Sequence, residues 1–180
     1  MKIYKLKIDV NKYKGCYVVE SKLSKLDLEK IDIGEQLNFC NNSISFKYAD
    51  EEGLILGDVI KCWDFVGFLI NDRTRNILEM NPKLKIQYIK FQDDFNLINN
   101  LLVIDALDTE KTKFEYFENE IISIDKISLK KMDFPPLFQI TFPDGLVELD
   151  YFVTNEFIEY IKQNNIKGFK FEEVWDSEKD

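Results

Sequence analysis

Short stretches of this chain alternate hydrophobic with polar positions, which is the pattern of half-buried strands. The first stretch covers residues 2–8 and puts Tyr4, Leu6 and Ile8 on one face. A second stretch, at 15–20, follows across a polar turn, so we expect an N-terminal hairpin. Further strands are expected at 44–48, 84–91, 98–104, 112–118, 121–128 and 137–142.

The spacing becomes helical from Trp63 onward. Asn71 or Asp72 can cap a helix here, which we place at 71–80. Residues 21–43 give a weaker pattern that fits either a loop or a short helix. Turn-forming residues gather at Asp50-Glu51-Glu52-Gly53 and at Pro143-Asp144-Gly145.

A second helix is expected at 154–164, between two apolar segments. Thr154 can accept a hydrogen bond from a first-turn N–H group, and Val153 and Ile158 are spaced as a hydrophobic staple. Asn165 offers a left-handed stop, after which the chain leaves as a strand. The residues expected to anchor this helix on the sheet are Val153, Phe157, Ile158 and Ile161, beside a strand that carries Phe169 and Phe171.

These elements predict an α+β fold, in which a mostly antiparallel sheet carries two main helices and strand exceeds helix. Fifteen Phe and eight Tyr favour strands, because aromatic side chains fit a half-buried pleated surface. A chain of 180 residues with 45% hydrophobic content can bury one sizeable core. We therefore expect a single domain over 1–180, with an N-terminal strand region to about residue 56.

The two helix starts repeat one another at a spacing of 83 residues. Leu69-Ile70-Asn71-Asp72 corresponds to Phe152-Val153-Thr154-Asn155, and Ile77-Leu78 corresponds to Tyr160-Ile161. Each segment reads as an apolar pair, a polar cap, a helix, a polar stop and a strand. An internal duplication predicts this pattern, and so do two ordinary capped helices.

Charge is distributed unevenly within the net charge of −9. Residues 1–30 carry eight Lys against four acidic residues, whereas residues 31–180 carry sixteen Lys or Arg against twenty-nine acidic residues. The acidic part repels nucleic acid and anionic membranes and attracts a basic protein, although solubility accounts for it equally well. Candidate partner-attracting residues, which lack a core role, are Asp50, Glu51, Glu52, Asp93 and Asp94.

Cysteine usage and the chain start both favour the cytoplasm. Cys16, Cys40 and Cys62 are odd in number and widely spaced, so we expect reduced, mostly buried thiols rather than disulfides or a zinc site. The first residues lack the apolar run of a signal peptide, and no run is long enough to span a bilayer.

Catalytic chemistry is poorly represented. The absence of histidine removes Ser-His and Cys-His pairs and the usual zinc sites, and Gly53 and Gly57 lack the setting of a phosphate loop. Asp105, Asp108 and Glu110 follow an apolar strand and could hold a divalent ion or transfer protons. An Asp at a strand end also closes turns by accepting N–H bonds, and the spacing matches no cation loop, so we expect no metal or cofactor.

The remaining acidic clusters fit solvated faces. They comprise Asp93 and Asp94 and, further along, Glu115, Glu118 and Glu120. Phe114 and Tyr116 alternate with Glu115 and Phe117, which predicts packing on both faces of that strand.

Three segments carry a resemblance to a known family. They are the strand end Asp105-Ala106-Leu107-Asp108-Thr109-Glu110-Lys111-Thr112, the strand Leu137-Phe138-Gln139-Ile140, and the final helix with Gly168-Phe169-Lys170-Phe171-Glu172-Glu173-Val174. With Asp58 to Leu78, which is similar to an earlier helix segment, the region 57–175 resembles the eleventh immunity-protein family of bacterial polymorphic-toxin systems. Gln139 stands where members often carry Arg, Thr112 replaces the more frequent Ser, and the first fifty residues match only loosely.

The resemblance implies a non-enzymatic cytoplasmic inhibitor that binds a cognate toxin and protects the producing cell. The acidic excess favours a basic toxin, because opposite potentials speed association. Two other functions remain open. One is a metal-assisted hydrolase that uses Asp105, Asp108 and Glu110, and the other is a non-catalytic scaffold or ligand-binding module.

Overall fold

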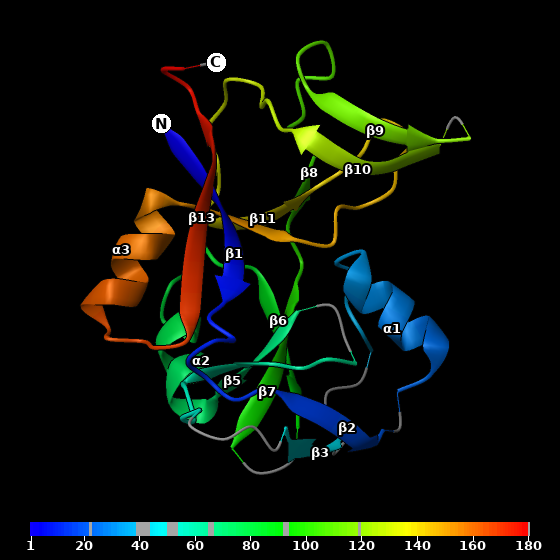
Figure 1. Ribbon diagram of the computed structural model, residues 1–180. Coiled ribbons are helices and arrows are strands. Elements are labelled where there is room, and N and C mark those ends of the chain that lie inside the picture. The colour runs from blue at the N-terminus through cyan, green and yellow to red at the C-terminus, as the bar shows by residue number, and fades with distance from the viewer. Residues whose placement is uncertain are drawn as a thin grey trace.

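The computed structural model describes residues 1–21, 23–38, 44–49, 54–64, 67–91, 94–118 and 120–179 (Figure 1). Over these residues the fold is α+β, the strands pair mostly antiparallel, and strand residues outnumber helix residues, as predicted. The prediction of two helices is wrong, because three are described. The additional helix, α1 (Lys25–Asp32), lies in the weakly patterned segment, where Ser24 and Asp27 form a reciprocal cap.

One sheet contains five strands in the order β13-β1-β12-β11-β8. They are β1 (Lys2–Ile8), β8 (Val103–Ile104), β11 (Leu137–Ile140), β12 (Tyr151–Thr154) and β13 (Phe169–Asp176). Neighbouring strands are antiparallel except for β8 and β11, which are parallel. The N-terminal strand β1 is thus enclosed between two strands from the C-terminal part of the chain (Figure 1).

The predicted N-terminal hairpin is wrong for this reason. Both edges of β1 are occupied by β12 and β13, so β1 has no edge left for β2 (Cys16–Glu20). β2 instead pairs with β3 (Ser45–Tyr48). The turn expected at 50–53 lies outside the described residues.

A second sheet contains four antiparallel strands in the order β4-β5-β7-β6. They are β4 (Val59–Lys61), β5 (Phe68–Asn71), β6 (Ile86–Lys90) and β7 (Phe95–Asn100). All six residues of β7 are buried. The single strand expected at 98–104 is divided between β7 and β8, which belong to different sheets.

The two sheets are built from equivalent units. The first unit comprises β4, β5, α2 (Asp72–Glu79), β6 and β7, and the second comprises β11, β12, α3 (Asn155–Gln163), β13 and β1. The strand orders β4-β5-β7-β6 and β11-β12-β1-β13 correspond, with antiparallel neighbours in both. β5 and β12, α2 and α3, and β6 and β13 each begin 83 residues apart. This agreement favours the internal duplication, with β1 supplying the fourth strand of the second unit.

The helix signals are confirmed in part. Asn71 caps α2, since its side chain accepts a hydrogen bond from the N–H of Thr74 at 2.8 Å. Thr154 occupies the N-cap of α3, but the predicted side-chain cap bond is absent and its hydroxyl is buried without a partner. Asn165 has a φ of 51°, as expected of a left-handed stop. The turn at 143–145 is confirmed by the N–H of Gly145, which donates to the carbonyl of Phe142 at 3.0 Å.

The main core lies between the two sheets and their helices. It contains all four predicted anchors of α3, namely Val153, Phe157, Ile158 and Ile161, each no more than 6% exposed. Phe169 and Phe171 pack against this cluster, as expected. Two further clusters fill the outer faces, one beneath α1, β2 and β3 and one between the five-stranded sheet and residues 106–107 and 127–129.

A two-stranded hairpin projects from this body (Figure 1). Its strands are β9 (Lys113–Phe117) and β10 (Glu120–Lys126), close to the predicted bounds. The prediction that both faces of β9 pack is wrong, because the side chains of Tyr116 and Phe117 are 61% and 63% exposed. Among the described residues, no helix is long and apolar enough to cross a membrane.

Candidate functional site

Two of the three carboxylates considered for metal binding, Asp105 and Asp108, make contacts within the chain. Asp105 receives both of its short contacts from Lys130 Nζ, at 2.8 Å. Asp108 closes a turn, because its side chain accepts the N–H of Glu110 at 3.3 Å and its carbonyl accepts the N–H of Thr112 at 2.8 Å. Over the described part of the chain, no three His, Cys, Asp or Glu residues are grouped so that they could hold a metal ion.

Little of the predicted partner-attracting set can be placed. Asp50, Glu51, Glu52 and Asp93 lie outside the described residues. Asp94 is exposed in the turn before β7, and its carbonyl accepts the N–H of Asp72 at 2.7 Å. The contribution of these five residues to binding therefore stays a prediction.

The two departures from the family pattern are both buried hydrogen-bonding residues. The Thr112 hydroxyl donates to the carbonyl of Ser128 at 2.9 Å and accepts its N–H at 3.1 Å. Gln139 is fully buried, and its Nε2 donates to the carbonyls of Asp32 at 3.2 Å and Glu148 at 3.3 Å. Gln139 thus fixes the backbone of the segment that leads into β12.

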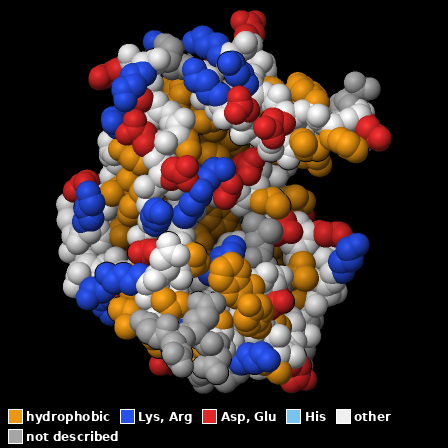
Figure 2. All heavy atoms as spheres, viewed as in Figure 1, with side chains coloured by type: hydrophobic (Ala, Val, Ile, Leu, Met, Phe, Trp, Pro, Cys, Tyr) orange, Lys and Arg blue, Asp and Glu red, His pale blue; other side chains and the backbone are white. Residues whose placement is uncertain are grey.

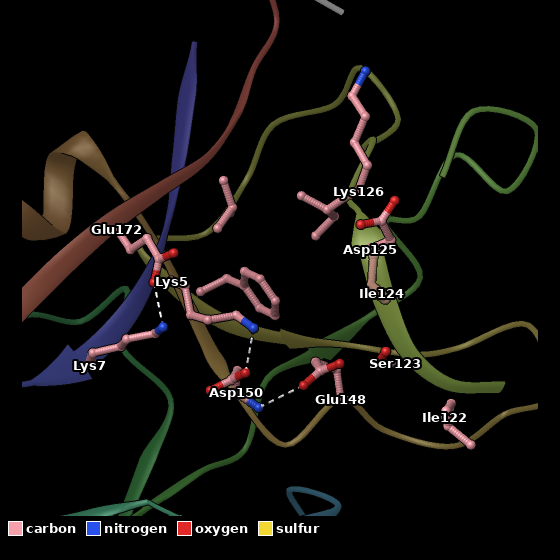
Figure 3. Close-up of a pocket in the computed structure, with 13 residues that line it drawn as sticks. Lys5, Lys7, Ile122, Ser123, Ile124, Asp125, Lys126, Glu148, Asp150 and Glu172 are labelled. Carbon is pink, nitrogen blue, oxygen red and sulfur yellow. Dashed lines mark hydrogen bonds and ion pairs between the residues drawn. The ribbon is translucent and has the colours of Figure 1, made fainter. Parts of the chain in front are cut away.

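That segment borders a groove of about 430 Å³ between the hairpin and the five-stranded sheet. We call it the hairpin groove. Its floor consists of Lys5, Lys7, Phe152, Glu172 and Val174, one wall is residues 122–127 of the hairpin, and Glu148 and Asp150 lie between them. Figure 3 shows β10 across the groove from the lysines of β1. On this face of the molecule, basic and acidic side chains lie among exposed hydrophobic side chains (Figure 2).

Ion pairs neutralise most of the charge in the hairpin groove. Lys5 lies 2.5 Å from Asp150 and 5.9 Å from the ring centre of Phe152, and Lys7 pairs with Glu172. The hydrogen bond from Lys7 lowers the pKa of Glu172. These pairs hold extended lysine side chains against the sheet.

Glu148 differs from Asp150 and Glu172, the paired carboxylates of the hairpin groove. Its burial raises its pKa, an effect that the nearby Lys5 only partly offsets. Its side chain accepts the N–H of Asp150 at 3.4 Å, but no cation lies within 4 Å of it among the described residues. A half-buried carboxylate without an ion pair is a favourable position for an incoming positive group.

Three nucleophilic side chains, Ser123 in the hairpin groove and Cys16 and Cys62 in the cluster beneath α1, β2 and β3, are engaged in other contacts. The hydroxyl of Ser123 donates to Glu115 across the hairpin. Cys16 and Cys62 are buried free thiols, as predicted, and lie on adjacent backbone segments, whereas Cys40 is outside the described residues. Hydrogen bonding with Cys62 and burial raise the pKa of Cys16, which keeps that thiol protonated.

The hairpin presents large apolar side chains to solvent beside the groove. Tyr116, Phe117 and Ile122 are 61%, 63% and 61% exposed. Other exposed apolar residues, including Tyr17 and Trp63, lie on or beside β2. The combination of exposed aromatic rings beside a groove of paired charges and a few apolar side chains is typical of a surface that binds a polypeptide.

Sequence reasoning missed the groove residues Lys5, Lys7, Glu148 and Glu172. The alternation in 2–8 identifies the two lysines as one face of a strand, but it does not reveal what lies opposite. Comparison with known protein families and with curated proteins gives no match. The resemblance to the immunity-protein family therefore rests on the sequence segments quoted for it.

Proposed function

We propose that this protein is a cytoplasmic, non-catalytic immunity protein that binds and neutralises a cognate toxin, with the β9–β10 hairpin at the centre of its binding surface. The observation that carries the proposal is the exposure of Tyr116, Phe117 and Ile122 on an arm that projects from the body. Clustered exposed apolar groups are characteristic of binding surfaces, and aromatic side chains dominate binding energy where they become buried.

Charge supports a basic toxin as the partner. The net charge of −9 favours encounter with a positively charged protein and disfavours binding to nucleic acid or an anionic membrane. In this proposal Asp50, Glu51, Glu52, Asp93 and Asp94 contribute to the long-range attraction. The association rate should then fall as salt shortens the Debye length to about 10 Å and below, while the dissociation rate changes less.

The hydrolase alternative receives no support from the site geometry. Asp105 is neutralised by Lys130, and Asp108 is engaged in a turn. A general scaffold or ligand-binding module would also use the exposed hairpin. Only binding to a toxin separates that alternative from immunity.

Co-expression tests the proposal directly. The wild-type chain is expressed with the C-terminal domain of a candidate toxin from a neighbouring gene, and cell growth and complex formation are measured. We expect the wild type to restore growth and to form a one-to-one complex. The double variant Tyr116→Ala with Phe117→Ala should lose both, with little loss of stability because both rings are exposed.

Tyr17→Ala is the matched control, since Tyr17 is 42% exposed on β2, away from the hairpin. It should rescue growth like the wild type. Loss of rescue by Tyr17→Ala and not by the hairpin variant would move the binding surface to β2. Failure of the wild-type chain to bind or rescue would refute the immunity function.

A further inference from the structure

The floor of the hairpin groove corresponds to a covered surface in the first unit. In the second unit, Lys5 of β1 pairs with Glu172 on one side and Phe152 on the other. The equivalent row in the first unit is Leu97, paired with Ile89 and Leu69. Those three residues are at most 1% exposed, because residues from the segment 31–46 pack over them.

Residues 35–37 of that covering segment are held by side chains of the first unit. The backbone N–H of Leu37 donates to Oε1 of the Gln87 side chain at 2.9 Å, and Nε2 of the same side chain donates to the carbonyl of Leu37 at 2.8 Å. Asn99 donates to the carbonyl of Glu35 at 2.8 Å. The first unit thus shows how a polypeptide segment is accommodated on this face of the fold.

In the second unit the same face is charged and borders the open hairpin groove. Lys7 and Lys170 are opposite each other on β1 and β13, at the positions where the first unit has Asn99 and Gln87 on β7 and β6. A permanently covered surface is normally apolar, whereas an intermittently covered surface must also be stable in water. The substitution of lysine and glutamate for leucine and isoleucine therefore fits a reversible occupant.

The hairpin wall offers backbone hydrogen-bonding groups to that occupant. Six consecutive residues, 122–127, line the groove. Successive side chains of a strand point to opposite faces, so a consecutive run means that the strand's edge borders the groove. Among the described residues β10 pairs only with β9, which leaves its other edge open over about 20 Å.

We propose that an extended segment of a partner protein occupies the hairpin groove, adds to the open edge of β10 as a third strand, and places a lysine or arginine beside Glu148. Strand addition supplies affinity through main-chain hydrogen bonds, and pockets for alternate side chains supply specificity. Glu148 supplies the charge complementarity, because it is the half-buried groove carboxylate without a cation within 4 Å in the described structure. The partner's role as a toxin rests on the proposed function, whereas the binding mode does not.

The test uses a phage-displayed library of random peptides of about ten residues, the upper length of ordinary strands. Peptides selected on the wild-type chain are synthesised and their affinity is measured by calorimetry. We expect them to share a lysine or arginine flanked by alternating apolar residues. Binding should slow hydrogen exchange of the β10 amides and leave the amides of β2 unchanged.

Two modifications separate this mode from general attraction. Glu148→Gln should weaken binding about tenfold or more, because a charge-assisted contact is lost, while the matched variant Glu110→Gln should bind like the wild type. Glu110 is exposed and outside the groove, and its substitution makes the same charge change. A paired strand directs every second N–H to its neighbour. N-methylation of one set of alternate peptide residues should therefore abolish binding, and N-methylation of the other set should leave it intact.

The proposal is overturned if no peptide is selected or if Glu148→Gln and Glu110→Gln bind the selected peptide equally well. It is also overturned if N-methylation of either set of alternate peptide residues has the same effect on binding. Protection of β10 by a second copy of the chain, without peptide, would also overturn it. Competition with the toxin domain of the co-expression experiment separates the two proposals. If the toxin binds and a groove peptide does not inhibit it, the immunity function stands and this binding mode is refuted for the toxin. If the peptide binds and the toxin does not, the binding mode stands and the immunity function is refuted.

Discussion

Replacing Phe157 by alanine should lower the free energy of unfolding by about 3–5 kcal/mol. Phe157 is 1% exposed in the main core, and its ring centre lies 6.1 Å from that of Phe169. Transfer of the lost apolar atoms to water accounts for about 1.5–3 kcal/mol. The remainder comes from the cavity left between α3 and the sheet, because packed surroundings relax only partly.

Urea unfolding followed by circular dichroism measures this loss, and a thermal midpoint lower by about 6–20 °C should accompany it. Phe117→Ala is the matched control, since it removes the same atoms from a side chain that is 63% exposed. It should change stability by no more than about 0.5 kcal/mol. Equal small losses in the two variants would refute the packing of α3, and equal large losses would refute the exposure of the hairpin.

Three further predictions concern buried groups and backbone strain. Burial raises the pKa of Glu148 in the folded state, so the folded protein favours the protonated carboxyl. The resulting stabilisation is complete below the ordinary glutamate pKa of about 4.3 and is lost as pH rises through the raised pKa of the folded state. The stability of Glu148→Gln relative to wild type should therefore increase over that pH range, and a pH-independent difference would contradict this. Thr112→Val should cost about 1–3 kcal/mol by denaturant unfolding, because it removes the acceptor of the Ser128 N–H, whereas Thr112→Ser should keep most of the stability. Gly168→Ala should cost about 1–3 kcal/mol, since φ is 120° and an added Cβ would lie 2.5 Å from a carbonyl of β4. Gly145→Ala, at a φ of 88° in open space, should cost less, and equal thermal midpoints would contradict the clash.

Local features were predicted well where neighbouring residues decide them. Asn71 caps a helix and Asn165 ends one, because each acts on backbone groups within a few residues. For Thr154 the predicted position was right and the predicted hydrogen bond was wrong. Thr154 occupies the N-cap of α3, but its hydroxyl is buried without a partner. A capping residue therefore located the helix start but not the hydrogen bond.

Strand pairing was predicted less well because it depends on distant segments. The alternation in 2–8 gave β1 and its buried face, yet the strand pairs with β12 and β13, which lie about 150 to 175 residues away. Period-two alternation contains no information on which strand lies alongside. The 83-residue repeat was visible at the helix starts, but only the matching strand orders revealed β1 as the missing strand of the second unit.

The sequence by itself determined the α+β class, most of the strand positions, the spacing of the two capped helices and the buried face of α3. These follow from periodicity and capping, which act over a few residues. Only the tertiary structure decided that Lys5, Glu148 and Glu172 meet around the hairpin groove, because strand pairing and sheet packing bring them together from distant parts of the chain. It also decided that the hairpin's aromatic rings face solvent, since their alternation fits a buried and an exposed strand equally.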